Sequence, residues 1–185
     1  MTADMDENFA YFGGLLAAAC HAVSAEYFQL PIAAGDAVYR ERVYCYELYH
    51  RMRQEWGQFP FSLGGEIDKN GHPLFRTGPY AQAKPDFLVH VPGSMDGNLA
   101  CVEVKPSTAS TDALVQDLSK LSWFCTQARY RGGILLIYGE ESETRSEAIL
   151  GEALRREAEV ARIDLSRIHI MRHRTIGHEA TRVGD

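Results

Sequence analysis

The sequence has no CxxC motif and none of the paired cysteine and histidine spacing that a structural zinc site requires. A chain of 185 residues can bury a hydrophobic core without a disulfide framework, so its four cysteines need not pair. They are widely spaced, at Cys20, Cys45, Cys101 and Cys125. We therefore expect buried thiols in a reducing compartment, which favours a cytoplasmic protein.

Long hydrophobic runs are also missing. The longest apolar stretch, Phe9 to Val23, is too short to span a bilayer. The residues before it, Asp4 to Glu7, are acidic where a signal peptide would be basic. The sequence thus predicts a soluble protein without a membrane partner.

Positive charge is scarce. The chain has 19 Lys and Arg against 25 Asp and Glu, a formal net charge of −6, and its first 35 residues contain no Lys or Arg. This balance argues against a protein that is held to nucleic acid by bulk positive charge. It leaves open an enzyme that brings divalent cations to a phosphate group.

The chain shows no internal repeat, no low-complexity tract and no Pro/Ser-rich linker, which favours one domain over residues 1–185. Apolar periodicity and turn residues predict a mixed α/β fold within it. We expect an N-terminal helix within 1–35, a core over 36–139, a helix and a strand within 140–172, and a disordered polar tail over 173–185. The expected elements of the core and C-terminal part are a helix from Gly35-Asp36 to about Glu55, strands over 61–69, 85–91 and 99–105, a helix over 112–128, a buried central strand over 134–138, a helix over 144–161 and an edge strand over 166–171.

Charged residues gather at one end of two neighbouring predicted strands. Glu103 and Lys105 share one face of their strand because side chains alternate with a period of two. Antiparallel pairing through the loop after Val91 would set Asp86 opposite about residue 104. Two buried carboxylates repel each other, and a divalent cation relieves that cost. The alternative interpretation is a surface salt-bridge cluster at a sheet edge.

These residues resemble a known fingerprint. Lys84-Pro85-Asp86, followed 17 positions after Asp86 by Glu103-Val104-Lys105, is similar to the PD-(D/E)XK motif of the restriction-endonuclease-like superfamily. The predicted order of elements from Asp36 to Tyr138 also resembles the superfamily's αβββαβ core, a mixed central sheet flanked by helices. The resemblance implies a nuclease that hydrolyses phosphodiester bonds with Mg²⁺, for which Mn²⁺ would substitute.

The resemblance also implies residue roles. Asp86 and Glu103 would be metal ligands, with the carbonyl of Val104 as a further ligand. Lys105 would orient or help deprotonate the attacking water and stabilise the charge that develops on the phosphate. Oxygen ligands of this kind suit Mg²⁺, which is bound through a few carboxylates plus substrate phosphate.

The resemblance further implies a third acid from the helix before the strands. Glu47 is the best candidate as a metal ligand and catalytic residue, although an exposed glutamate paired with Arg51 is the alternative. Glu66 and Asp68 share a strand face and are the next candidates, each with a plain half-exposed acid as the alternative. Lys120 lies on the helix after the motif and would contact a phosphate, unless it is a solvated lysine.

The leading functional hypothesis is therefore a metal-dependent DNA endonuclease of prokaryotic defence or DNA repair, with the pathway implied by the resemblance alone. The second is a catalytically silent subunit that uses the same fold for binding or assembly. A processing enzyme for RNA or a small molecule is the third, because fold does not fix substrate. No helix-turn-helix or zinc finger is visible, so we do not expect sequence-specific recognition by this chain alone, and structure-selective cleavage or recruitment by a partner subunit is more economical. A homodimer would supply the two sites that cutting both strands needs.

Overall fold

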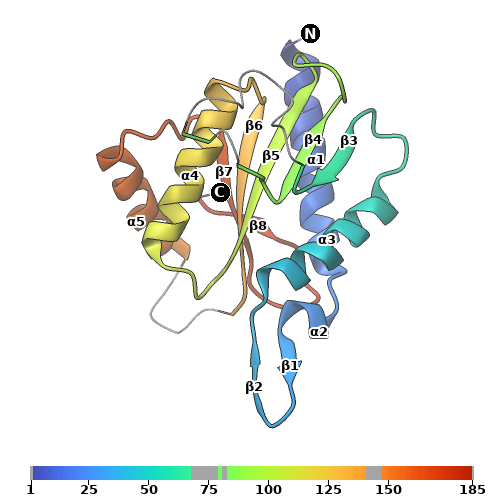
Figure 1. Ribbon diagram of the computed structural model, residues 1–185, viewed down its shortest axis with the longest axis vertical. Coiled ribbons are helices and arrows are strands. Elements are labelled where there is room, and N and C mark those ends of the chain that lie inside the picture. The colour runs from blue at the N-terminus through green and yellow to red at the C-terminus, as the bar shows by residue number, and fades with distance from the viewer. Residues whose placement is uncertain (1, 68–78, 81–82, 141–146, 185) are drawn as a thin grey trace.

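A mixed β-sheet forms the centre of the protein in the computed structural model, which describes residues 2–67, 79–80, 83–140 and 147–184. The sheet has six strands within this part of the chain (Figure 1). Pairing is antiparallel from the first strand to the third, parallel from the third to the fifth, and antiparallel again at the last. In spatial order the strands are β3 (Ser62–Gly65), β4 (Phe87–His90), β5 (Asn98–Pro106), β6 (Gly132–Tyr138), β7 (Ile168–His173) and β8 (Thr181–Arg182).

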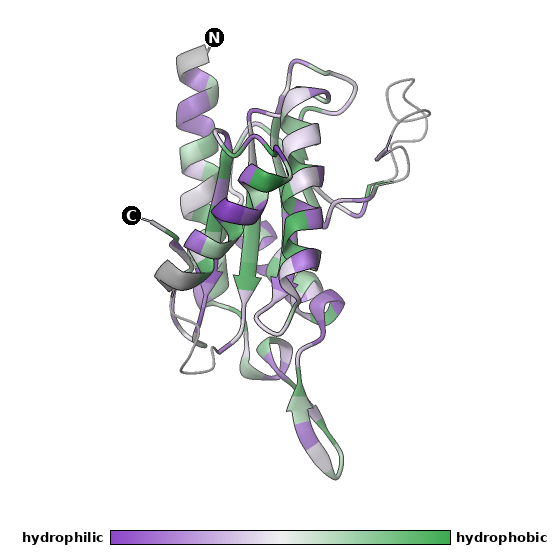
Figure 2. Ribbon diagram, turned by 90° about the vertical axis from the view of Figure 1, so that its left-hand side faces the viewer, coloured by the Kyte–Doolittle hydropathy of each residue, from purple (hydrophilic) through white to green (hydrophobic). Residues whose placement is uncertain are grey.

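Helices cover both faces of the sheet. Helices α1 (Thr2–His21) and α3 (Glu41–Glu55) pack on one face, and α4 (Thr111–Thr126) and α5 (Glu147–Val160) pack on the other (Figure 1). Between the layers the strands are largely hydrophobic (Figure 2). All seven residues of β6 are buried, as expected for a central strand with both faces covered.

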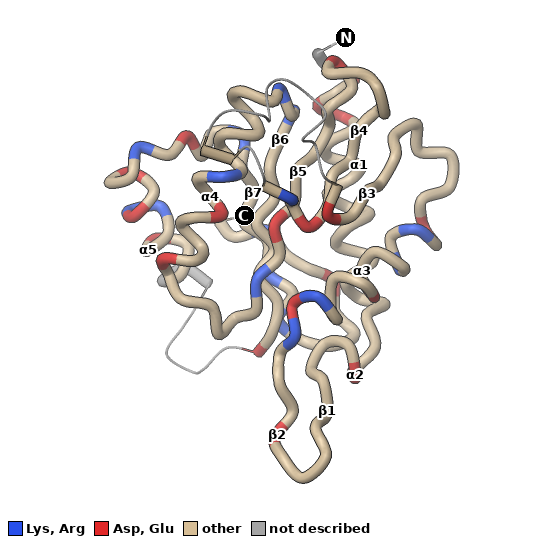
Figure 3. The backbone as a smooth tube through the Cα atoms, in the orientation of Figure 1, with Lys and Arg blue, Asp and Glu red and all other residues tan. Residues whose placement is uncertain are grey.

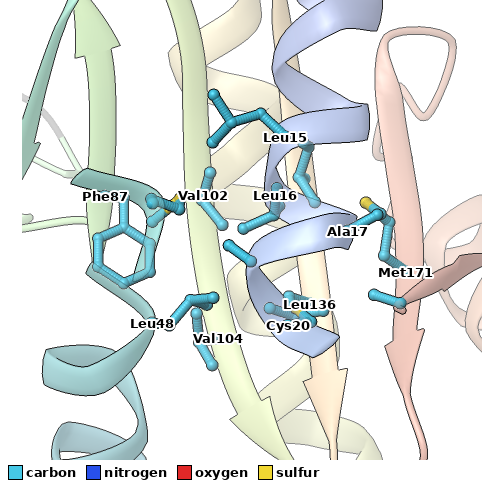
Figure 4. Packing of buried hydrophobic residues seen from close by; sticks show 14 of the residues in the cluster. Leu15, Leu16, Ala17, Cys20, Leu48, Phe87, Val102, Val104, Leu136 and Met171 are labelled. Carbon is cyan, nitrogen blue, oxygen red and sulfur yellow. The ribbon is translucent and has the colours of Figure 1, made fainter. Parts of the chain in front are cut away.

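Strand alternation divides the core in two. In β5, Val102 and Val104 face α1 and α3, where they pack with Leu16 and Leu48 (Figure 4). Cys101 faces the other layer with α4 and α5. The predicted alternation of β5 is therefore confirmed, and it determines which side chains can reach the charged end of the strand.

The predicted helix start at Gly35-Asp36 is wrong. Gly35–Val38 forms strand β2, which pairs with β1 (Leu30–Ile32) in a hairpin that projects from the body beside the short helix α2 (Ala25–Phe28) (Figure 1). Ala34, in the turn, has a φ of 60°, so the chain reverses there before it can begin a helix. Helix α3 therefore begins only at Glu41, which brings this acid into the first helical turn.

The C-terminal predictions are also corrected. Strand β7 lies inside the sheet between β6 and β8, not at its edge. The segment predicted as a disordered tail contributes β8, which pairs with β7. Ala180 and Val183 are buried, and the Ala180 amide donates to the carbonyl of Ala17 at 3.4 Å. Apolar burial against α1 and α5 thus orders a segment whose composition is mostly polar.

The order α3, β3, β4, β5, α4, β6 reproduces the predicted succession of helix, three strands, helix and strand. Strands β3 and β4 are shorter than predicted. Their pairing extends only from Ser62 opposite His90 to Gly65 opposite Phe87. The predicted turn at Asn70-Gly71 and the predicted cap at Thr144 lie outside the described residues. Among the described helices, none is long and apolar enough to cross a membrane.

Candidate functional site

The two halves of the sequence fingerprint meet at one end of the β4–β5 pair. Phe87 pairs with Val102, which sets Asp86 opposite Glu103, one residue from the predicted register. The Val104 amide donates a hydrogen bond to Oδ2 of Asp86 at 2.7 Å. The strand that carries Glu103 and Lys105 therefore holds Asp86 directly.

Two lysines cross-link acids from three different elements at this point. Acidic and basic positions lie close together where β4 and β5 pass between α3 and α4 (Figure 3). We call this group the ionic cluster, and its members are Glu41, Asp86, Glu103, Lys105, Asp117 and Lys120.

Lys105 joins the strand to two helices. Its Nζ lies 2.9 Å from Oε2 of Glu41 in α3 and 3.3 Å from Oδ2 of Asp117 in α4. It also donates to the Val104 carbonyl at 3.2 Å. The lysine is thus anchored at the end of β5, where Pro106 closes the strand.

Lys120 makes a second bridge, deeper in the fold. Its Nζ lies 2.9 Å from Oε2 of Glu103 and 3.0 Å from Oδ1 of Asp117. Asp117 and Lys120 are three residues apart on α4 and so project from the same side of the helix. Ser110 caps this helix through its side chain, which accepts from the Ala113 amide at 3.2 Å. Lys120 is therefore a member of the cluster and not the solvated lysine that was the alternative.

Two acids of the cluster are buried, and the cluster carries excess negative charge. Glu103 is 2 % exposed and Asp117 is 5 % exposed, and Oε1 of Glu103 has no hydrogen-bond partner. Four carboxylates against two ammonium groups leave a formal charge of −2 when all six groups are ionised. A buried carboxylate oxygen without a donor costs free energy that a cation would recover.

The acids respond to this excess. Burial raises the pKa of Asp86 to about 6, and nearby Glu41 and Asp117 add to the rise, while the hydrogen bond from the Val104 amide opposes it. Burial likewise raises the pKa of Glu103 to about 8, although Lys120 pulls it down. Burial, assisted by the neighbouring acids, therefore favours the protonated form of both carboxyl groups.

The pKa values of the two lysines are also raised. Burial works to lower the pKa of Lys105, but Asp117 and Glu41 outweigh it, so the pKa of Lys105 lies above its ordinary value. Glu103 and Asp117 raise the pKa of Lys120 in the same way against its burial. Both lysines are thus ammonium ions at neutral pH, which can donate hydrogen bonds and stabilise anions but cannot accept a proton.

Glu47 does not join this cluster. Its Oε1 accepts from Nε of Arg51 at 2.6 Å, and Nη2 of Arg51 donates to Ser24 Oγ at 3.1 Å. The acid that α3 brings to the cluster is Glu41, six residues before Glu47. Because successive helix residues rotate by about 100°, Glu41 and Glu47 project from different sides of α3. The pairing with Arg51 that was the alternative interpretation of Glu47 is present, although Glu47 is buried and not exposed.

The remaining predicted residues lie elsewhere. Glu66 follows β3 and forms an exposed ion pair with Arg42 at 3.1 Å, beside the cluster but not within it. Asp68 lies outside the described residues. Sequence reasoning missed Glu41 and Asp117. The available signal for Asp117 was its spacing of three residues from Lys120, and Glu41 gave none because the start of α3 was misplaced.

A cavity of about 330 Å³ opens beside Asp86, between α3 and the adjoining ends of β3 and β4. Its lining residues are Arg42, Cys45, Tyr46, Tyr49, Gly65, Glu66, Asp86 and Phe87. Asp86 thus belongs both to the ionic cluster and to the wall of an open space. A ligand in the cavity would lie directly beside the fingerprint.

The oxygen atoms of the cluster could hold a hard cation only in part. Within the described residues, no three or more His, Cys, Asp or Glu side chains form a group that could hold a metal ion. Mg²⁺ commonly needs only one or two carboxylates, because water and phosphate complete its coordination. Asp86, Glu103 with its unpartnered Oε1, and the Val104 carbonyl, which accepts from Lys105 Nζ, could form such a partial set.

We compared the chain with known proteins in three ways. No family model matches it, and searches of curated proteins and of solved structures likewise found no match. Any assignment of function therefore rests on this chain's own residues and their geometry.

Proposed function

We propose that the chain is a Mg²⁺-dependent nuclease of the restriction-endonuclease-like type, acting on DNA phosphodiester bonds as an endonuclease. The observation that carries this proposal is the hydrogen bond from the Val104 amide to Asp86, which joins the two halves of the PD-(D/E)XK resemblance at one buried, negatively charged point. The order of elements from α3 to β6 supports it.

Asp86, Glu103 and the Val104 carbonyl would hold the metal ion. Bound there, Mg²⁺ or Mn²⁺ would lower the pKa of a water molecule and offset the charge of the phosphate. Lys105 remains an ammonium ion and therefore donates to a phosphate oxygen or to the attacking water. Glu41 and Asp117 hold its Nζ at the end of β5, so these two acids position Lys105.

A catalytically silent binding or assembly subunit is the second candidate. The observation in its favour is that each lysine of the ionic cluster already bridges two carboxylates. Lys120 occupies Oε2 of Glu103, a position where a metal ligand would be needed. In this interpretation the cluster would be a structural cross-link between the sheet and its helices.

The negative net charge bears on partners under either candidate. With a formal charge of −6, the chain would bind DNA weakly and in a metal-dependent way. A homodimer or a partner subunit would supply further contacts, and cutting both strands of DNA would require two sites. A cytoplasmic role in prokaryotic defence or repair is part of the same proposal.

Plasmid cleavage tests the leading candidate. The intact chain with Mg²⁺ should nick supercoiled DNA, and Asp86→Asn and Lys105→Ala should each lower the rate by about 100-fold or more. Asp96→Asn is the matched control, because Asp96 lies in the β4–β5 loop with its side chain 82 % exposed. Equal cleavage by all four proteins would refute the nuclease.

Calorimetry separates the two candidates. Titration with Mg²⁺ or Mn²⁺ should show binding to the unmodified chain and to Asp96→Asn, but not to Asp86→Asn. A silent subunit would show no metal binding at all and no cleavage, while retaining its fold.

A further inference from the structure

The cavity beside Asp86 has a wall made by one stripe of α3. The four helix residues of its lining are spaced by three, one and three positions, so they project from a single side of the helix. The opposite wall is made by residues at the ends of β3 and β4. A ligand placed between them would contact both the helix and the strand end that carries Asp86.

Two tyrosines of the stripe offer an aromatic surface. The hydroxyl of Tyr49 donates to the Leu63 carbonyl at 3.3 Å, and its ring lies 6.4 Å from that of Phe87, so Tyr49 is held in place. Tyr46, four residues from Arg42, is 64 % exposed in spite of its size. An exposed aromatic ring beside a fixed one suits stacking of a planar ligand.

The cavity also presents a cation that a phosphate could engage. Arg42 Nη2 lies 3.1 Å from Oε1 of Glu66, with the two side chains 67 % and 46 % exposed. Such an exposed ion pair adds little to stability. A phosphate group, which a guanidinium binds with two parallel hydrogen bonds, can therefore replace Glu66 as the partner of Arg42.

Size and shape limit what can enter. A Cβ on Gly65 would lie 3.9 Å from Cδ2 of Tyr49 and 3.5 Å from the Asp86 carbonyl, so the absent side chain leaves this part of the cavity open. The volume of about 330 Å³ is at the small end for ligand sites. Bases in a duplex are paired and stacked, and reach such a pocket only when they leave the helix.

We propose that this cavity binds one unpaired nucleotide, with its base against Tyr46 and Tyr49 and a phosphate at Arg42. The inference rests on the proposed function for the identity of the ligand as nucleic acid, and it adds a preference for single-stranded or unpaired DNA over continuous duplex. It places the bound nucleotide beside Asp86, where the cavity meets the ionic cluster.

Fluorescence anisotropy with the intact chain tests this preference. The probes are a fluorescein-labelled single strand of about 12 nucleotides, within the range that one small domain covers, and a closed hairpin duplex of the same sequence, both in Ca²⁺. The single strand should bind more tightly. Tyr46→Ala should weaken that binding by about tenfold, and Tyr46→Phe should restore it, because stacking requires only the ring. Arg42→Ala should weaken binding and flatten its dependence on salt.

Tyr11→Ala is the matched control, since Tyr11 is 56 % exposed on α1 and outside the cavity. Equal affinity for the two probes, binding of neither, or an affinity of Tyr46→Ala equal to that of the unmodified chain would overturn the inference. If the anisotropy results contradict the inference but Lys105→Ala loses plasmid cleavage, only the nucleotide site is rejected and the proposed nuclease stands. If Lys105→Ala cleaves plasmid as fast as the unmodified chain, the proposed nuclease activity is rejected. A preference for the single strand that depends on Tyr46 would then still support nucleotide binding in the cavity.

Discussion

Lys120 Nζ lies 2.9 Å from Oε2 of Glu103, so a lysine from α4 contacts a carboxyl group that β5 places almost completely out of contact with solvent. The other oxygen of Glu103 has no hydrogen-bond partner. The pair thus contains both a stabilising contact and an uncompensated polar atom. Changing either residue should show whether the contact or the unpartnered oxygen has the larger effect on the stability of the fold.

Removing the charge of Lys120 should destabilise the fold. Lys120→Met leaves Glu103 and Asp117 without their shared cation, and breaking a buried pair from one side costs about 3 kcal/mol of unfolding free energy. Urea unfolding would measure the loss, and Lys120→Arg, which keeps the charge, is the control. Should Lys120→Met unfold at the same urea concentration as the unmodified chain, the bridge does not contribute to stability.

Glu103 should make stability depend on pH in the neutral range. Its pKa rises from an ordinary 4.5 to about 8 in the folded protein, chiefly through burial. Unfolded chains therefore lose this proton at lower pH, so the contribution of Glu103 to stability is full below 4.5 and is lost as pH rises through about 8. Glu103→Gln cannot titrate, and should gain stability relative to the unmodified chain over this range.

Urea unfolding at about pH 5 and about pH 8.5 would measure that relative gain. Glu152→Gln serves as the control, because Glu152 is an exposed acid on α5 with its side chain 66 % exposed. A difference between Glu103→Gln and the unmodified chain that stays constant with pH would contradict the prediction.

How far the sequence predicts this fold depends on how strongly each segment is patterned. The period of two along β5 and the uninterrupted apolar run of β6 identify buried strands without any tertiary information. Gly35-Asp36 carries a helix-start signal that is equally compatible with a hairpin, and pairing of Leu30 with Val38 decides between them. The segment after residue 173 is polar in composition, yet burial of Ala180 and Val183 and pairing of β8 with β7 dock it, which no local pattern reveals.

The sequence predicts the part of the candidate site that lies on the paired strands, but not the residues that the helices bring to it. Hairpin pairing brings Asp86 to Glu103 because the strands are joined by a short loop, so their register is local information. Which turn of α3 faces the cluster depends on how the helix packs on the sheet, and the sequence contains no direct signal of that rotation. The same applies to Asp117, whose burial comes from α4 docking against β5 and β6.

The two acids of α3 should behave differently when changed. Glu41→Gln weakens the hold on Lys105, so under the proposed function it should lower the cleavage rate by about tenfold. Glu47→Gln removes only the partner of Arg51, and should leave cleavage unchanged while costing about 1 kcal/mol of stability. Plasmid nicking and urea unfolding together measure both. The opposite outcome, with Glu47→Gln inactive and Glu41→Gln active, would return the catalytic acid to Glu47.

His173 should make the protein sensitive to mild acid. Burial lowers its pKa from 6.5 to about 4, and its Nδ1 lies 2.8 Å from the hydroxyl of Tyr44 among aromatic rings. Unfolding lets the imidazole take a proton at higher pH, so its contribution to stability is full above 6.5 and is lost as pH falls through about 4, by at most about 3 kcal/mol.

Thermal or urea unfolding between these pH values should therefore show a steeper loss of stability with acid for the unmodified chain than for His173→Gln. His50→Gln, at an exposed position of α3, should follow the unmodified chain, and a His173→Gln profile of the same steepness would mean that His173 does not cause the loss.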